Sequence, residues 1–408
     1  MSCFFIGCID EIPIETVSEF ESVLVVEATI TNEFEQQEIK LSRSFALDSL
    51  GPPPEQSANV KVTGSNGFDM SFTETDSGLY KSNQPFAAEA NVDYSLEIVT
   101  SDGRRYASSI MQLTQPTTID DLYAERGFNE NNEEGVSIRV DAYDPTGNSK
   151  FYRYTYEETY KIIAPKYSPL ELVINNDDFP YFPIDIEGLS QQELIEFFVI
   201  RDFRPEQEQV CYNTVNSNTI IIENTNQFEE DRINGFRVRF ISQENYIMSH
   251  RYSILVNQYV QSSEAHEFYK SLKELSETET IFATTQPGFL NGNMQALTNS
   301  DEKVVGFFEV VASDSKRIFF SYADVFPGED LPPYYIQCDA IFTPDLYSAD
   351  PLTGEIGYSP LQEAITDGKQ YWDENLDGGI GQPYQMVLPA CGDCTVLGET
   401  QIPEFWED

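Results

Sequence analysis

Short apolar segments, separated by turn residues, recur along most of this 408-residue chain. Residues 22–31 (SVLVVEATIT) are rich in β-branched side chains, and residues 93–99 alternate apolar and polar side chains with the period of a strand. Asp102-Gly103 then gives the strongest hairpin signal in the sequence. Strands spaced in this way over about 90 residues predict an immunoglobulin-like β-sandwich at residues 21–115.

The chain is long enough for a second domain, which we expect to span residues 116–408. Residues 151–163 form its longest predicted strand, along which Tyr152, Tyr154 and Tyr156 alternate. Alternate tyrosines of a strand usually pack in a sandwich core or on its flank. The predicted fold is therefore mainly β, with an N-terminal immunoglobulin-like β-sandwich followed by a larger β-rich domain that has a few short helices.

The segment at about residues 165–210 interrupts the strand pattern. Prolines punctuate it, and a short helical stretch at 189–199 begins with Ser190 and Glu193 in the spacing of a capping box. We interpret this segment as an insertion into the second domain that is rich in proline and aromatic residues.

Two further predictions concern the chain after residue 260. The apolar spacing of residues 263–275 predicts an amphipathic helix, with His266 on its polar and solvated side. Residues 304–312 and 316–321 are predicted to be two strands of a hairpin that turns at Asp314-Ser315.

The charge of the chain excludes several classes of partner. The sequence has 24 Lys and Arg against 69 Asp and Glu, which gives 24 − 69 = −45 at pH 7. A phosphate backbone or an anionic lipid surface would repel such a protein, and no run of Lys or Arg offsets the acidic excess. Nucleic-acid binding is therefore not expected.

The first eight residues (MSCFFIGC) are interpreted as the end of a signal peptide that finishes in a lipobox. In this interpretation a peptidase cleaves before Cys8, the Cys8 sulfur carries diacylglycerol, and residues 9–20 form a tether. The alternative is a frayed apolar N-terminus with two ordinary cysteines. A complete secretory signal also has a cationic region, so we expect an upstream in-frame start that encodes it.

Four cysteines follow the proposed lipidation site, an even number that allows two disulfides with three possible connectivities. A CxxC motif near the C-terminus could instead form a redox or zinc site. No second CxxC motif accompanies it, and the two histidines lie far from zinc-finger spacing, so structural disulfides are expected. The candidates are Cys211, Cys338, Cys391 and Cys394.

Catalytic motifs give little support to an enzyme. The chain has no nucleophile elbow, zinc-protease, P-loop or dinucleotide-binding signature. Paired carboxylates able to hydrolyse glycosides arise by chance among 69 acidic residues, so they carry no signal. His250 lies just before a predicted strand and is expected to be a hydrogen-bonded edge residue rather than a base. We therefore expect no catalytic residues.

Residues 373–380 (DENLDGGI) resemble the first half of a calcium loop, because the oxygens of Asp373, Asn375 and Asp377 alternate before a glycine turn. Tyr384 stands where such a loop would have its bidentate Glu. A structural Ca²⁺ is thus the one cofactor that the sequence suggests. The alternative is a surface turn rich in Asp, Asn and Gly that needs no metal.

Three aromatic residues of the insertion, Phe179, Tyr181 and Phe182, lie beside prolines in the segment FPYFP. Such residues are difficult to bury, and the prolines hold them at low entropic cost. We expect them to contact a protein partner; a platform for stacking sugars is the alternative.

Several segments together resemble the Bacteroidota lipoprotein family known as domain-of-unknown-function family 4249. They are distributed over nearly the whole chain, and the C-terminal one is the most specific. The matching segments are residues 24–31 (LVVEATIT), Cys211-Tyr212, 252–259 (YSILVNQY), Gln286-Pro287, Gly292-Asn293, 305–308 (VGFF), 316–319 (KRIF) and 391–406, with CGDC at its start and PEFW at its end.

The resemblance implies a lipoprotein encoded beside a TonB-dependent, SusC-like outer-membrane transporter. It supports lipidation of Cys8, and Asp10 and Glu11 match the acidic stretch of lipoproteins sent to the cell surface. We therefore expect a non-enzymatic, surface-exposed partner of such a β-barrel transporter in nutrient capture or uptake. One alternative is an accessory subunit of the machinery that assembles outer-membrane proteins or exports surface lipoproteins; the other is a hydrolase of surface glycans or peptides.

Overall fold

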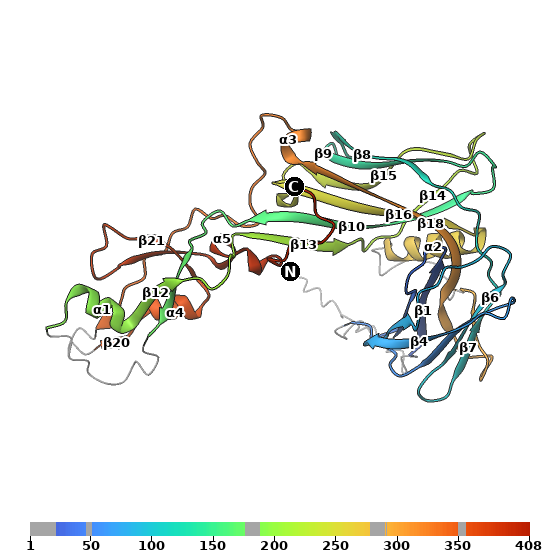
Figure 1. Ribbon diagram of the computed structural model, residues 1–408, viewed down its shortest axis with the longest axis horizontal. Helices are drawn as coiled ribbons and strands as arrows, with labels where there is room; N and C mark the ends of the chain where they lie inside the picture. The colour runs from blue at the N-terminus through green and yellow to red at the C-terminus, as the bar shows by residue number, and fades with distance from the viewer. Residues whose placement is uncertain (1–21, 46–50, 176–187, 278–289, 291, 350–355) are drawn as a thin grey trace, which may run out of the picture.

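The computed structural model of the protein is mainly β, with 45% strand and 13% helix in large open sheets and a few short helices. This confirms the predicted fold class. Figure 1 shows an elongated molecule in which two β-rich lobes form the body and a narrower arm extends from one end. The structure describes residues 22–45, 51–175, 188–277, 290, 292–349 and 356–408.

The largest sheet has 13 strands and runs through both lobes. Its strand order is β13-β10-β16-β18-β1-β2-β5-β4-β3-β6-β7-β17, and β14 pairs with the start of β10. The bounds are β1 (Leu24–Thr31), β2 (Glu38–Arg43), β3 (Asn59–Gly64), β4 (Asp69–Asp76), β5 (Leu79–Ser82), β6 (Tyr94–Val99), β7 (Arg105–Ser108), β10 (Phe151–Ile163), β13 (Val210–Asn216), β14 (Ile221–Asn224), β16 (Arg251–Gln261), β17 (Met294–Ala296) and β18 (Val304–Ser321).

The first lobe (residues 22–113 and 294–311) has a single apolar core. Alternate side chains of β1, β3 and β6, such as Val26, Val60 and Leu96, are almost fully buried in it. Met294 and Phe308 enter the same core from β17 and β18. The core of the first lobe is therefore completed by two strands, β17 and β18, that follow most of the second lobe in the sequence. Of these, β18 pairs with β1 in parallel.

The second lobe (residues 117–164, 210–261 and 312–326) is a sandwich. One layer is the end of the large sheet, and the other is a three-stranded sheet of order β15-β9-β8. Tyr152, Tyr154 and Tyr156 point from β10 into the core between the layers, as their alternation predicts. The bounds of the second layer are β8 (Ile119–Phe128), β9 (Glu134–Tyr143) and β15 (Arg232–Ser242).

A single long strand, β18, belongs to both lobes. Its first half pairs with β1 in parallel, and its second half pairs with β16 in antiparallel fashion. The predicted hairpin at Asp314-Ser315 is therefore wrong. Contacts with neighbouring strands keep this segment extended. Asp314 lies opposite Gln258 of β16, and its carboxylate accepts a hydrogen bond from the Ile119 N–H at 2.7 Å.

Helix α2 (Ser263–Glu277) confirms the predicted helix and lies at the junction of the lobes. His266 is only 3% exposed, so its predicted solvation is wrong. Its ring packs against Phe151 of β10, with 4.9 Å between centroids, and burial lowers its pKa. The helix contacts β10, β14 and β18, so the sheet covers a face that would be polar on an isolated helix.

Beneath this helix, a buried ion pair joins strands of the two lobes. The guanidinium of Arg153 on β10 pairs with the carboxylate of Glu309 on β18, whose side chain is fully buried. That carboxylate also accepts hydrogen bonds from the Thr29 hydroxyl at 2.9 Å and the Gln261 amide at 3.0 Å. The ring of Tyr259 lies 4.5 Å from the guanidinium carbon and covers the cation.

The remaining elements lie mostly in the arm, which comprises the described residues of 165–209 and 338–393. None of the described helices combines the length and the apolar character that a membrane crossing requires. The elements are β11 (Leu170–Ile174), α1 (Gln191–Phe198), β12 (Val199–Phe203), β19 (Ser348–Ala349), β20 (Ile356–Tyr358), α4 (Pro360–Thr366), β21 (Gln370–Glu374), β22 (Tyr384–Val387) and α5 (Pro389–Gly392), with η1 (Tyr246–Met248) and α3 (Tyr322–Val325) in the second lobe and η2 (Cys394–Val396) at the base of the arm.

Candidate functional site: the arm

The arm has its own small apolar core, built from two distant parts of the sequence. The chain leaves β10, forms β11, α1 and β12, and returns to the body as β13; a second pass after α3 adds α4, β21 and β22. Leu194 and Phe198 of α1 meet Leu361 of α4 and Met386 of β22 in this core. Ser190 caps α1 with Glu193 in the predicted capping box.

Two disulfides fasten the base of the arm. Cys211 of β13 is bonded to Cys394, and Cys338 is bonded to Cys391, with Cα atoms 5.6 and 5.7 Å apart. Both separations suit an unforced bridge. The structure thereby selects one of the three connectivities that the sequence leaves open: the two cysteines of the CxxC motif bind different partners, one in the body and one in the arm.

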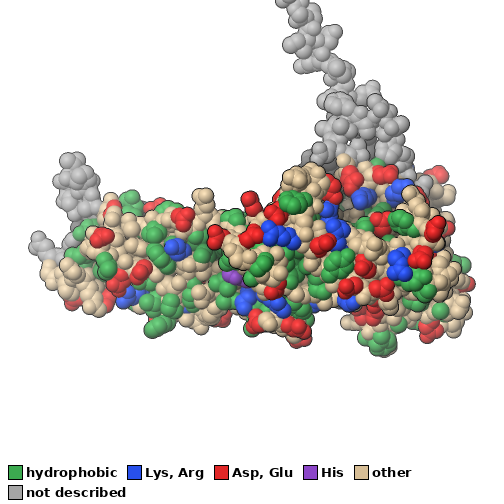
Figure 2. All heavy atoms as spheres, turned by 90° about the horizontal axis from the view of Figure 1, so that it is seen from above, with side chains coloured by type: hydrophobic (Ala, Val, Ile, Leu, Met, Phe, Trp, Pro, Cys, Tyr) green, Lys and Arg blue, Asp and Glu red, His purple; other side chains and the backbone are tan. Residues whose placement is uncertain are grey.

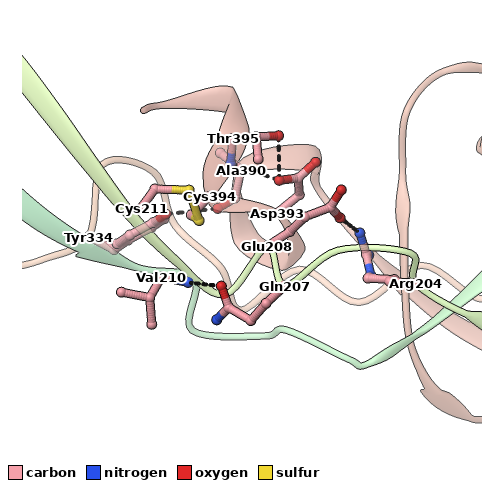
Figure 3. Close-up of a disulfide and its surroundings, with 10 residues drawn as sticks. All are labelled: Arg204, Gln207, Glu208, Val210, Cys211, Tyr334, Ala390, Asp393, Cys394 and Thr395. Atoms are coloured by element: carbon pink, nitrogen blue, oxygen red, sulfur yellow. Dashed lines mark hydrogen bonds and ion pairs between the residues drawn. A yellow bond between two sulfur atoms is a disulfide. The ribbon is translucent and has the colours of Figure 1, made fainter. Parts of the chain in front are cut away.

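Polar contacts surround the Cys211–Cys394 disulfide, as Figure 3 shows. The buried guanidinium of Arg204 pairs with Glu208 and donates to the Gln370 side chain at 2.7 Å. The Glu208 carbonyl in turn accepts a hydrogen bond from the Cys394 N–H at 2.9 Å. The base of the arm is therefore held by hydrogen bonds from both of its passes as well as by sulfur.

The C-terminal residues pack onto the large sheet and complete the attachment. The Trp406 ring lies 4.9 Å from that of Tyr212 on β13 and 6.0 Å from that of Phe319 on β18. The guanidinium of Arg317 lies 3.6 Å above the Phe405 ring. The chain therefore ends against the body rather than on the arm, and Figure 1 places the C-terminus beside the large sheet.

The surface of the arm exposes several apolar side chains. Val173 and Ile200 lie directly opposite each other in the β11–β12 pair and are 45% and 42% exposed. Phe203, which directly precedes Arg204 of the arm's polar base, is 73% exposed. Figure 2 shows such green side chains spread between charged ones over the upper face of the arm. Exposed apolar side chains on a projecting element suit contact with a protein partner.

A shallow groove adds to this surface. It has a volume of about 420 Å³ and lies between residues 341–344 and helix α4. Ile341 is 43% exposed beside it, and Pro344 and Pro360 form part of its wall. The arm thus offers protruding apolar side chains and a groove of mixed lining, since Glu363, Asp367 and Lys369 also line it.

The partner-contact residues predicted from the sequence, Phe179, Tyr181 and Phe182, lie outside the described residues, as do Cys8 and the tether at 9–20. Val173 and Ile200 belong to the same insertion but were missed. Each lies in a short apolar segment, LELVI and VIRDF, whose alternation could have indicated a two-sided hairpin.

The suggested calcium ligands lie at the turn between β21 and β22. Asp373 is the fourth residue of β21 and accepts a hydrogen bond from the Glu374 N–H, and the Asn375 N–H donates to the Pro383 carbonyl at 2.9 Å. Within the described part of the chain, no group of three or more His, Cys, Asp or Glu side chains is placed to hold a metal ion. The calcium site stays a prediction.

His250 lines a small cavity at the root of the arm. The cavity has a volume of about 220 Å³, and its wall includes Tyr246 and Tyr334. Burial and the nearby Lys161 cation lower the pKa of His250, which favours a neutral imidazole. The cavity walls bring no carboxylate beside this imidazole, so the described residues supply no acid–base pair there.

Comparison with known proteins adds one finding. The model of a family described as a domain of unknown function (DUF4249) matches residues 9–317. The match includes the first pass of the arm and Cys211, whereas Cys338, Cys391 and Cys394 lie beyond it. A search of the curated proteins finds no match.

Proposed function

Because this chain belongs to the DUF4249 family, we propose that it is a surface-exposed outer-membrane lipoprotein. In this proposal it is the non-enzymatic partner of a TonB-dependent transporter in nutrient capture or uptake. Acyl chains on Cys8 hold it at the membrane, residues 9–20 tether it, and the arm contacts the transporter.

The cysteine chemistry supports an exported protein. Both disulfides join residues that are distant in sequence, by 183 and 53 positions. Disulfides of this structural kind persist in oxidising surroundings and are rare where glutathione and thioredoxin keep thiols reduced. A location outside the cytoplasm is consistent with this pairing and with a lipid anchor at the N-terminus.

The observation that carries the proposal is the exposed apolar surface on a covalently fastened arm. A docking surface that is already ordered before its partner binds loses less conformational entropy on binding. The disulfides fix the base of the arm, and Val173, Ile200 and Phe203 remain in solvent at its surface. Their burial by a partner would release about 25 cal/mol for each Å² of apolar area covered.

Anchoring makes a modest interface sufficient. A tethered protein meets a neighbour in the same membrane at a high effective concentration, so the arm does not need a large contact area. Stable anchoring needs more than one acyl chain, which a diacylglyceryl cysteine supplies.

Co-purification from the native membrane tests the proposal. We expect a tagged full-length chain, extracted in mild detergent, to bring down a large β-barrel protein. The double variant Val173→Asp, Ile200→Asp should lose most of that barrel, whereas Ile110→Asp, at a residue 66% exposed in the first lobe, should retain it. Repeated recovery of no barrel with the wild-type chain would reject the partnership.

Deletion separates this proposal from an assembly role. If the chain serves uptake, the deletion strain should lose growth on particular nutrients and keep its other surface proteins. Loss of several unrelated surface proteins would instead indicate a subunit of outer-membrane assembly or lipoprotein export. Mass spectrometry of the native protein should find Cys8 acylated at the mature N-terminus, and a free Cys8 thiol would contradict the anchor.

A further inference from the structure

The second lobe has an open groove that is lined by residues of its own strands and loops. It runs beside β15, the edge strand of the three-stranded sheet, and has a volume of about 880 Å³. A second hollow of about 760 Å³ continues it toward β14 and the end of α2, and Phe236 and Arg237 line both. The first hollow is within the size range of small-molecule sites.

An anchored loop presents an aromatic ring to this groove. Phe228 is 59% exposed, and its N–H donates a hydrogen bond to the Thr225 carbonyl at 2.9 Å. The loop is held by Asp231, which is 2% exposed, pairs with the Lys150 ammonium at 2.9 Å and accepts a hydrogen bond from the Thr225 hydroxyl. These contacts join the two ends of the loop that carries the ring, Thr225 and Asp231, to each other and to Lys150.

Irregularities of β15 shape the floor of the groove. The register with β9 shifts between Ile233 and Phe236 and again between Arg237 and Arg239. Gly235, in the first shift, has φ of +62°, and its backbone is held by the Asp141 carboxylate at 2.5 Å and the Arg139 guanidinium at 2.6 Å. Such bulges redirect side chains and hinder the addition of another strand at an edge.

The charged groups of the groove balance one another. Three arginines and three glutamates line the first hollow, whereas the whole chain has 24 cationic and 69 acidic residues. Arg232 pairs with Glu230 at 3.3 Å, and Arg237 pairs with Glu130. Locally, then, the groove has no net charge, and its walls are planar carboxylate and guanidinium groups beside aromatic rings.

We propose that this groove binds a neutral oligosaccharide. The guanidiniums can donate hydrogen bonds to the hydroxyls of a sugar and the carboxylates can accept from them, and the exposed Phe228 ring offers an apolar face for the C–H side of a pyranose. A ligand charged with either sign would meet like charges as well as opposite ones in the lining, and an anionic ligand would also meet the chain's −45 charge. The bulges of β15 oppose an added peptide strand, and a largely apolar ligand would desolvate the ion pairs without replacing their hydrogen bonds.

The inference names a ligand class for nutrient capture and in that respect rests on the proposed function. Its site is separate from the arm, so the two can fail independently. Binding is measured with the purified full-length chain alone, whereas the transporter partnership is measured by co-purification.

Isothermal titration calorimetry tests the groove with maltohexaose, cellohexaose, xylohexaose, mannohexaose and laminarihexaose as neutral probes and a polygalacturonate hexamer as the acidic one. We expect at least one neutral hexasaccharide to bind. Phe228→Ala should weaken that binding at least about fivefold, because it removes the stacking ring. Phe228→Trp should preserve binding, and Phe34→Ala, at a phenylalanine 78% exposed in the first lobe, should leave it unchanged.

Three results would overturn the proposal. They are binding of none of the neutral probes, binding of the acidic probe alone, and neutral binding that Phe228→Ala does not weaken. Circular dichroism of each variant should match the wild type, since Phe228 buries little apolar surface, and a folded Phe228→Ala chain with full affinity would place the sugar elsewhere.

Discussion

Among the described residues, the arm buries ten apolar side chains in its core, and the cores of the first and second lobes bury 21 and 26. The arm has two disulfides at its base, whereas the first lobe has none among its described residues. A small core supplies little stability beyond the entropy of ordering its chain. The comparison teaches that the smallest core is reinforced by covalent links: one disulfide belongs to the arm, and the other closes its base within the core of the second lobe.

The largest expected effect comes from removing the disulfides. Replacing Cys211 and Cys394 by Ser frees a closed segment of 183 positions, and the chain-entropy model gives a loss of about 5 kcal/mol; the Cys338–Cys391 pair, which closes 53 positions, gives about 4 kcal/mol. Hydrogen exchange should show early loss of protection in α4 and β22, with β1 and β3 unchanged. Equal loss in the first lobe would show that the arm and the body are one cooperative unit.

Truncation of a core side chain in the first lobe should instead destabilise that lobe and spare the arm. Phe308 is fully buried in the first lobe, on the strand that pairs with β1, so Phe308→Ala should lower the free energy of unfolding by about 4 kcal/mol through lost burial and an unfilled cavity. Denaturant titration measures the loss. Phe308 belongs to the core of the first lobe and not to that of the arm, so hydrogen exchange in the arm should stay close to that of the wild type.

The junction between the lobes gives a smaller effect. Glu309→Gln leaves the Arg153 cation without its buried partner, and we expect a loss of about 3 kcal/mol. Lys40→Gln breaks an ion pair that is more than half exposed and should cost less than about 0.5 kcal/mol. If thermal unfolding of the Glu309→Gln chain splits into two transitions, this pair is what couples the lobes.

Acid should weaken the body through Asp144, in the turn before β10. Burial disfavours the charged carboxylate, but hydrogen bonds from Thr146, Ser149 and Asn148 outweigh it and lower the pKa of Asp144 to about 2. A carboxyl with a lowered pKa stabilises the fold above its unfolded pKa, and this contribution is lost as the pH falls from about 4 to about 2. Asp144→Asn should therefore cost about 1–2 kcal/mol at pH 7.

Stability measured from pH 7 to pH 2 provides the check. The difference between the wild type and Asp144→Asn should narrow across the window between about pH 4 and pH 2, because the wild-type carboxyl becomes protonated there. A difference that stays constant over this range would show that the hydrogen bonds do not depend on the charge.

Local patterns in the sequence predicted local structure well. The alternation of Tyr152, Tyr154 and Tyr156 predicted a buried strand face, and Ser190 with Glu193 predicted the start of α1. Each of these signals is set by neighbours within a few residues, through strand pleating in one case and capping hydrogen bonds in the other.

Features that depend on distant neighbours could not be predicted in this way. Asp314 is a turn residue by composition, but its partners Gln258 and Ile119 keep it within β18. His266 lies on a polar helical side that β10 happens to cover. The pairing of Cys394 with Cys211 and the groove beside β15 likewise arise from segments far apart in sequence, and no local spacing encodes them.

The bond between Cys211 and Cys394 has a consequence for proteolysis. All of β14, β15, β16 and β18 lie between the two residues. A protease that nicks any surface turn in this interval would therefore leave two pieces still joined through sulfur and through the paired strands. Such a molecule would migrate as one species until a reductant is added, so a single cut in this interval would not separate the chain into two molecules.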